Sequence, residues 1–276
     1  MEILTIVAEG LEHPIMLKDF LYKNGLSKTL VKRVKYGGIT LDGQVVTVRA
    51  EVINGSRICI DLSGGRSENI PPMELPLRIV YEDECMLAVD KPRSMPTHPS
   101  KGNSLPTLAN AVMGYFGGDF VFRAVNRLDR DTSGIVIIAK DQMTANTLAA
   151  NMKRGDFAKS YKCTVEGKVI PCHGMIDAPI RREYEGSVKR IVAEDGKRAL
   201  TEYTLESTDG LTTVCKIALH TGRTHQIRVH MAHIGHPLVG DFLYGRRDSG
   251  DFDLRCVSIE LSHPITNERI KISVDN

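Results

Sequence analysis

Alternation of apolar and polar residues predicts strands along most of the chain. Residues 77–91, LRIVYEDECMLAVDK, form two apolar runs around an acidic turn, and residues 201–220, TEYTLESTDGLTTVCKIALH, alternate on both sides of Asp-Gly as a hairpin does. The runs FVFRAV (120–125), IVIIAK (135–140) and KSYKCTVEGKV (159–169) are typical of single strands. The abundance of hairpins predicts an α+β fold with a large, mostly antiparallel mixed sheet.

Three other segments predict helices that cover this sheet. Residues 97–116 contain a polar loop followed by TLANAVMGYF, and residues 141–155, DQMTANTLAANMKRG, begin with an N-cap residue and end with glycine. Residues 221–237, TGRTHQIRVHMAHIGHP, are typical of a strand and a loop followed by a short helix. The helices are few and short compared with the strands.

The first 62 residues form a separate small unit in this pattern. Residues 16–21 have the spacing of a short helix that Gly25 ends, and Ser27 can cap a second helix with an apolar inner face. ITLDGQVV (39–46) is a further hairpin signal. The outer face of the second helix carries Lys28, Lys32 and Lys35. A linker rich in Gly, Ser and Pro (63–76) separates this unit from a domain that spans residues 77–276.

Composition agrees with a soluble protein of one large and one small domain. The 276 residues are 42% hydrophobic and 25% charged, no apolar run is long enough for a bilayer, and the N-terminus lacks a signal-peptide pattern. The six cysteines lie far apart without a CxxC pair, which favours reduced thiols and a cytoplasmic protein. Residues 14–50 carry seven Lys or Arg against two Asp, and this excess of positive charge favours a polyanionic partner.

The loop NRLDRDTSG (126–134) holds more ionic groups than a turn between two strands requires. Hydrogen bonding of the loop backbone accounts for Asp131, Thr132 and Ser133. It does not account for Asp129, which follows an apolar residue and lies between two arginines. Neighbouring arginines keep a carboxylate ionised, so Asp129 is a candidate nucleophile or stabiliser of a cation.

Residues 220–237 contain five of the nine histidines. His230, His233 and His236 recur every three residues, a spacing that could hold a metal ion. However, no HExxH motif is present, and nearby Arg223 and Arg228 would repel a cation. The pattern therefore favours a basic wall that contacts phosphates and base edges, with no metal and no cofactor.

Four ordered motifs make the chain similar to RluA-type pseudouridine synthases over essentially its whole length. They are YEDECMLAVDKPRSMPTHPS (81–100), NRLDRDTSG with Asn126 where the family has His, KSYKCTVEG (159–167) and GRTHQIRVH (222–230). A second departure is Arg255, where members often carry His. The N-terminal unit resembles the S-four-like RNA-binding module through GLSKTLVKRV and GGITLDGQVV.

The resemblance implies a catalytic domain with a central cleft and a role for each matching residue. Asp129 would be the catalytic aspartate, Arg223 its ion-pair partner, and Tyr161 the aromatic residue that stacks on the uracil. Arg127 would help to fill the space that the flipped base leaves, and Ile227 would pack in the pocket. The reaction isomerises uridine in structured RNA and needs no cofactor. The lysines of the N-terminal unit would contact that RNA.

Two other functions fit parts of the sequence. The chain could be a non-catalytic RNA-binding factor in ribosome assembly, although Asp129, Tyr161 and Arg223 are all kept. A metal-dependent hydrolase built on the histidine cluster would be sensitive to chelators, which a synthase would not be. Family members act on large-subunit ribosomal RNA or transfer RNA, and the basic N-terminal unit favours ribosomal RNA. We expect a monomer that has no contact with membranes.

Overall fold

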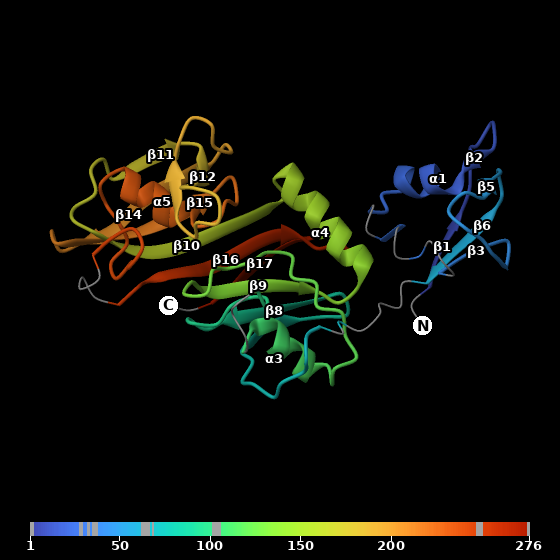
Figure 1. Cartoon of the computed structure of the whole chain (residues 1–276), viewed down its shortest axis with the longest axis horizontal. Helices are drawn as coiled ribbons and strands as arrows, with labels where there is room; N and C mark the ends of the chain where they lie inside the picture. Colours follow the sequence, from blue (N-terminus) through green and yellow to red (C-terminus); the bar gives the residue numbers. More distant parts are fainter. Residues whose placement is uncertain are drawn as a thin grey trace.

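The computed structural model describes residues 3–27, 30–31, 34, 38–61, 67, 69–100, 106–246 and 251–274. Its buried apolar side chains form two main clusters, one from residues 8–60 and one from residues 85–274. Figure 1 shows the N-terminal strands and helix apart from the large sheet. In the predicted linker (63–76), the backbone amides of Ser67 and Met73 donate to carbonyls of the large domain. No helix in the described parts of the chain combines the length and apolar character that crossing a bilayer requires.

The N-terminal unit is built from short strands and one described helix. Its sheet has the order β1-β6-β3-β4, and β2 pairs with β5. The predicted hairpin is present: Thr40 pairs with Val45, and Asp42 and Gly43 turn the chain with positive φ angles of 50° and 84°. The elements are β1 (Ile3–Val7), β2 (Ile15–Met16), α1 (Leu17–Lys23), β3 (Ile39–Leu41), β4 (Gln44–Val45), β5 (Glu51–Val52) and β6 (Arg57–Asp61).

The second predicted helix of this unit is described only in part. Leu30, Val31 and Val34 are buried, as their expected inward position requires. Lys28, Lys32 and Lys35 lie outside the described residues.

The large sheet confirms the mostly antiparallel prediction. Its order is β11-β14-β15-β10-β16-β9-β8-β7, and β17 pairs with β16. Every pair is antiparallel except β9 with β16. The strands are β7 (Ile79–Glu82), β8 (Met86–Lys91), β9 (Ser133–Ala139), β10 (Phe157–Glu166), β11 (His173–Asp177), β14 (Leu200–Thr208), β15 (Thr212–Leu219), β16 (Leu254–Ser262) and β17 (Arg269–Ser273).

Helices and one small hairpin complete the domain (Figure 1). Thr107 caps helix α3, and Asp141 and Gly155 bound helix α4 in the manner that the sequence predicts. The elements are α3 (Leu108–Tyr115), α4 (Gln142–Arg154), α5 (Gln226–His233), β12 (Ile180–Arg182) and β13 (Arg190–Val192).

The structure contradicts the expected strand FVFRAV. Residues 120–125 form a single bridge, between Ala124 and Ile138, and two further backbone hydrogen bonds to β9. One edge of β9 pairs with β8 along its length, and β16 pairs with the other edge only at Ser133 and Gly134. The apolar segment therefore lies beside the later part of this second edge, where its few hydrogen bonds do not make a strand. β15 ends at Leu219, so the strand expected at the start of residues 221–237 is also absent.

The parallel contact between β9 and β16 divides the sheet into two halves. Its register contains only two pairs, Arg255 with Ser133 and Cys256 with Gly134. Gly134 has a φ of 108°, and a Cβ there would lie 2.2 Å from the carbonyl oxygen of Cys256. The close approach of the two backbones therefore requires glycine at the end of the NRLDRDTSG loop. Arg255 also reaches across the seam to Asp90 on β8, at 2.8 Å.

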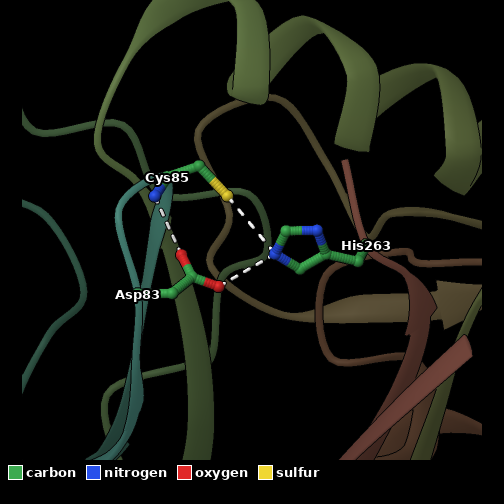
Figure 2. A group of neighbouring side chains, drawn as sticks. All are labelled: Asp83, Cys85 and His263. Atoms are coloured by element: carbon green, nitrogen blue, oxygen red, sulfur yellow. Dashed lines mark hydrogen bonds and ion pairs between the residues drawn. The ribbon is translucent and has the colours of Figure 1, made fainter. Parts of the chain in front are cut away.

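A second group of side chains joins the two halves, between the β7–β8 turn and the end of β16 (Figure 2). His263 Nδ1 faces the amides of Ile265 and Thr266, so the ring proton lies on Nε2 and is donated to Asp83 Oδ2, at 2.9 Å. Cys85 Sγ lies 3.6 Å from the same nitrogen. We call these three side chains, Asp83, Cys85 and His263, the clasp.

Hydrogen bonds join the three side chains of the clasp. Its three ligand-type atoms lie within 4.8 Å of one another, as at a metal site. Burial acts to raise the pKa of Asp83, but hydrogen bonds from Tyr81, His263 and two backbone amides hold it well below its usual range. With a proton on the inward nitrogen of His263, the group offers no free imidazole lone pair to a metal.

Candidate active site

A cavity of about 690 Å³ lies between the NRLDRDTSG loop, strand β10 and the segment that joins β15 to α5. The structure brings five of the sequence-predicted site residues together around it. They are Arg127, Asp129, Tyr161, Arg223 and Ile227. Asp129 comes from one side of the seam between the sheet halves, and the last three come from the other.

The backbone on both sides of Asp129 is held by the loop that follows β8. Thr97 Oγ1 donates to the carbonyl of Leu128 (2.8 Å) and accepts from its amide (3.2 Å). The fully buried Lys91 donates through Nζ to the carbonyl of Arg130, at 3.0 Å. These contacts fix the residues before and after Asp129, while its carboxylate stays about one-third exposed to the cavity.

Asn126 anchors the start of the loop where the resembled family has histidine. Its side chain is buried, donates to the carbonyl of Ile135 (3.0 Å) and accepts from the amide of Ile137 (2.9 Å). An amide carries both a donor and an acceptor, so it satisfies two backbone groups of β9 at once. The replacement of histidine by Asn126 therefore affects the contacts that hold the loop against β9, and not the lining carboxylate.

Tyr161 and Ile227 form an apolar part of the wall. Tyr161 on β10 is 5% exposed, and burial raises the pKa of its hydroxyl well above the usual value. It is therefore neutral at physiological pH and presents an aromatic surface to the cavity. Ile227 in α5 is 4% exposed and belongs to the same hydrophobic cluster. Arg127 is exposed beside them.

The ion pair predicted between Arg223 and Asp129 is absent from the structure, and this is a correction. Arg223 lies in the exposed turn before α5, and its Nε donates to the carbonyl of Arg198, at 2.9 Å. The helix begins only at Gln226, so the turn holds Arg223 at the rim of the cavity. Another group takes the predicted position beside the carboxylate.

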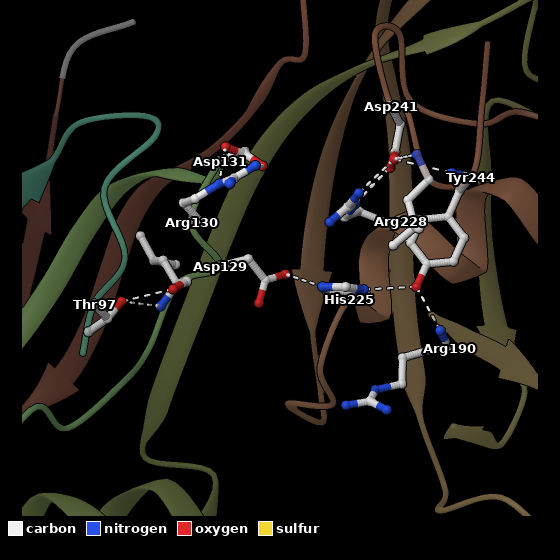
Figure 3. Close-up of polar contacts among 11 residues, drawn as sticks. Thr97, Asp129, Arg130, Asp131, Arg190, His225, Arg228, Asp241 and Tyr244 are labelled. Atoms are coloured by element: carbon white, nitrogen blue, oxygen red, sulfur yellow. Dashed lines mark hydrogen bonds and ion pairs between the residues drawn. The ribbon is translucent and has the colours of Figure 1, made fainter. Parts of the chain in front are cut away.

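His225 is the group that faces Asp129 (Figure 3). Its Nε2 lies 3.9 Å from Asp129 Oδ2, and its Nδ1 lies 2.8 Å from the hydroxyl of Tyr244. The residue has a left-handed backbone, with a φ of 57°, immediately before α5. Burial lowers the pKa of the imidazole despite the nearby carboxylate, so the ring is neutral at pH 7.

Arg228 supplies buried positive charge behind His225 (Figure 3). Its side chain is 5% exposed and binds Asp241 through two hydrogen bonds of 2.6 and 2.7 Å. The guanidinium also lies over the ring of Tyr244, 5.0 Å from its centroid. Burial acts to lower the pKa of Arg228, but Asp241 and then Asp129 outweigh it and raise the pKa. Arg228 is therefore permanently charged and contributes to the potential at Asp129.

The histidine spacing that suggested a metal site has a structural explanation. His230 is fully buried, with Nδ1 2.9 Å from Thr201 Oγ1 and Nε2 2.9 Å from the carbonyl of Ala178. His236 Nδ1 contacts the carbonyl of Glu166 instead. Within the described parts of the chain, the clasp is the group in which three ligand-type atoms lie close together, and it lies outside the lining of the cavity.

Several residues of the site were not singled out by the sequence. Lys91, Thr97 and His225 stand in quoted motifs but have no periodic pattern that marks them, and Tyr244 lies beyond those motifs. Arg228 stood in the same motif as Arg223, and the beginning of α5 decides which of the two is buried. A prediction of that helix boundary would have identified Arg228.

The fold and the cavity define an enzyme site with one carboxylate on a fixed backbone (Asp129), a neutral histidine (His225) and an aromatic wall (Tyr161). A family model described as RNA pseudouridylate synthase matches residues 86–233, more than half of the chain. The chain is 34% identical over 264 residues to the uncharacterized RNA pseudouridine synthase YjbO of Bacillus subtilis, covering 92% of this chain and 93% of that protein.

Two further comparisons agree. The chain is 36% identical over 258 residues to ribosomal large subunit pseudouridine synthase D of Pseudomonas aeruginosa, with coverage of 86% and 80%. Human RNA Pseudouridylate Synthase Domain Containing 1 has the same fold, with a TM-score of 0.63 at 24% identity over 75% of this chain and 86% of that one. The chain belongs to the RNA pseudouridylate synthase family, whose members are isomerases.

Proposed function

We propose that the protein converts uridine to pseudouridine in ribosomal RNA, with Asp129 as the catalytic carboxylate. The observation that carries this proposal is the geometry of Asp129. Its backbone is fixed on both sides by Lys91 and Thr97, and its carboxylate opens into the cavity opposite Tyr161. A carboxylate held in this way needs no movement to meet a substrate in the cavity.

The reaction requires an ionised group at the sugar and a site that retains the base. The bond between N1 and C1′ breaks, C5 bonds to C1′, and the proton on C5 is released while N1 gains one. Asp129 acts at C1′, where positive charge develops as the glycosidic bond opens. Tyr161, neutral and buried in the wall, provides a surface for the detached uracil. The base must leave the RNA stack to enter the cavity.

Arg228 and His225 take over the role that the sequence suggested for Arg223. Arg228 places a buried positive charge, paired with Asp241, in the lining of the cavity that holds Asp129. Arg223 and Arg127 lie exposed at the edge of the cavity, where they can contact RNA phosphates.

Ribosomal RNA is the proposed substrate because several relatives at 34–36% identity are named ribosomal large subunit pseudouridine synthase D. The charge pattern of the N-terminal unit supports this choice. Lys18, Lys23 and Arg49 are exposed there, in addition to the lysine stripe predicted from the sequence. We propose that residues 1–62 bind structured RNA and deliver it to residues 77–276.

Tritium release tests the proposal. Ribosomal and transfer RNA from cells that lack the protein, labelled at C5 of uracil, are incubated with wild type and with Asp129→Asn in the presence of EDTA. We expect release by the wild type from ribosomal RNA and at least about a 10³-fold lower rate for the variant. Tight RNA binding without release would show a non-catalytic RNA-binding factor instead. Release from transfer RNA alone would overturn the proposed substrate but not the chemistry.

A further inference from the structure

The hydroxyl of Tyr244 has a defined direction of donation. Its oxygen accepts a hydrogen bond from the backbone amide of Arg190, at 2.8 Å, at the start of β13. The other polar neighbour is His225 Nδ1, also at 2.8 Å. With the amide as donor, the hydroxyl proton of Tyr244 is directed at His225 (Figure 3). Burial raises the pKa of Tyr244 to about 12, so this proton is present throughout the physiological range.

The direction of this bond determines which nitrogen of His225 carries the ring proton. A neutral imidazole has one donor and one acceptor nitrogen. Because Nδ1 accepts from Tyr244, the proton lies on Nε2, the nitrogen that faces Asp129 Oδ2 at 3.9 Å. The opposite tautomer would leave the Tyr244 proton without its acceptor and would turn the Nε2 lone pair toward a carboxylate. The contacts at Nδ1 and at Nε2 therefore favour the same tautomer, with the proton on Nε2.

We propose that His225 is a positioning residue for the isomerase reaction, donating Nε2–H to Asp129, and that Tyr244 fixes the tautomer that permits this. The inference rests on the proposed function of Asp129. The gap of 3.9 Å is longer than a hydrogen bond, as is common for catalytic contacts before substrate is bound. A base in the cavity would bring the carboxylate and the imidazole into contact.

The groups around His225 keep it a neutral donor. Arg228 of α5 and Arg190 of β13 both oppose a positive charge on the ring, and Asp241 and Asp129 favour it. Burial is the largest influence and lowers the pKa. A neutral donor orients the carboxylate without forming a full ion pair with it, so Asp129 remains available to act at the sugar.

The left-handed backbone of His225 offers a matched pair of variants. Asparagine tolerates the φ of 57°, and its amide reaches the place of Nδ1 but not that of Nε2. Glutamine is longer, and its amide can place an N–H where Nε2–H stands. His225→Asn therefore removes the donor to Asp129, and His225→Gln keeps it. His173→Asn, on the exposed edge strand β11, is the control.

Single-turnover tritium release at saturating protein measures the chemical step. We expect His225→Asn to be slower by about 100-fold, the effect of losing one preorganised donor. His225→Gln should stay within about tenfold of the wild type, and His173→Asn should equal it. Melting temperatures of all variants establish that each one is folded. Equal rates for wild type and His225→Asn, or equal losses in the Asn and Gln variants, would overturn the positioning role.

Nitrogen NMR of histidine-labelled protein reads the tautomer independently of activity. Protonated and unprotonated ring nitrogens resonate far apart, and we expect Nε2 of His225 to be the protonated one. Tyr244→Phe should mix the tautomers and reduce the rate about tenfold. A ring protonated on Nδ1, or on both nitrogens at pH 7, would refute the assignment. If the wild type released no tritium from any RNA, the proposed function would fail, while the spectrum would still report the tautomer.

Discussion

Lys91→Met tests whether the loop after β8 controls the position of Asp129. Lys91 is fully buried, and its ammonium group donates to the carbonyls of Pro92 (2.8 Å), Met95 (2.7 Å) and Arg130 (3.0 Å). Methionine fills a similar volume but offers no donor, so the three carbonyls lose their partner. The substitution therefore removes the contact that fixes the residue after Asp129.

Two opposing effects set the size of the stability change. Three partly buried carbonyls without a donor cost at most about 1–3 kcal/mol each, or about 3–9 kcal/mol together. Against this, burial lowers the pKa of Lys91 from 10.5 to about 8, so removing the buried charge raises the free energy of unfolding by about 3 kcal/mol. The loss of hydrogen bonds is the larger effect, and we expect the free energy of unfolding to fall by about 3 kcal/mol.

The depressed pKa of Lys91 also predicts a pH dependence. Between pH 8 and pH 10.5 the unfolded chain keeps the Lys91 proton and the folded chain releases it. Stability rises with pH wherever the unfolded state binds more protons, so the wild type should gain up to about 3 kcal/mol over Lys91→Met in this window. Urea denaturation at a series of pH values measures the difference.

The activity assay distinguishes a displacement of Asp129 from a loss of global stability. Asp129 displaced by about 1 Å would slow single-turnover tritium release about 100-fold, at a temperature where the variant is folded. Lys140→Met is the matched control, because Lys140 also binds a carbonyl, that of Asp83, and pairs with Glu82, but lies outside the lining of the cavity. It should lose stability and keep its rate. A folded Lys91→Met protein with the wild-type rate would refute the reasoning.

Two further substitutions test the cavity wall and the seam. Arg228→Met leaves the fully buried Asp241 without its ionic partner, so the free energy of unfolding should fall by about 3–5 kcal/mol. Adding Asp241→Asn removes the charge and keeps the acceptor for the amides of Leu243 and Tyr244, so it should restore stability but not tritium release. Restored activity in the double variant would show that the charge of Arg228 is unnecessary. Gly134→Ala places a Cβ 2.2 Å from the carbonyl of Cys256, and a drop in melting temperature corresponding to at least about 2 kcal/mol is expected. An unchanged melting temperature would show that the seam tolerates wider spacing.

Local patterns were sufficient to predict most of the large domain. Alternation located the β14–β15 hairpin, and capping residues located the ends of α4, because both signals lie within one element. The prediction of a strand at FVFRAV was wrong because this segment meets β9 through one bridge and two hydrogen bonds, too few for a strand. The sequence of an apolar run does not contain that information.

The candidate site was predictable to the level of its motifs. The charge around Asp129 singled it out, and the resemblance to RluA-type pseudouridine synthases pointed to Tyr161 and Ile227. All three line the cavity. The sequence did not show that His225, and not Arg223, faces Asp129, because the direction of each side chain depends on the backbone before α5. His225 has a left-handed backbone there, and a positive φ at a non-glycine residue is not visible in a sequence.

The division of the sheet has a consequence for how substrate affinity is used. Asp129 belongs to the half that contains β9, and Tyr161, His225 and Arg228 belong to the other half. Contacts between the halves include two residue pairs of β9 and β16, the ion pairs Arg255–Asp90 and Arg93–Asp253, and the clasp. A nucleotide that touches both halves therefore sets the distance between the reacting groups. Contacts with RNA far from the uridine can stabilise the arrangement in which that distance is short. A truncated RNA should therefore react more slowly as well as bind more weakly.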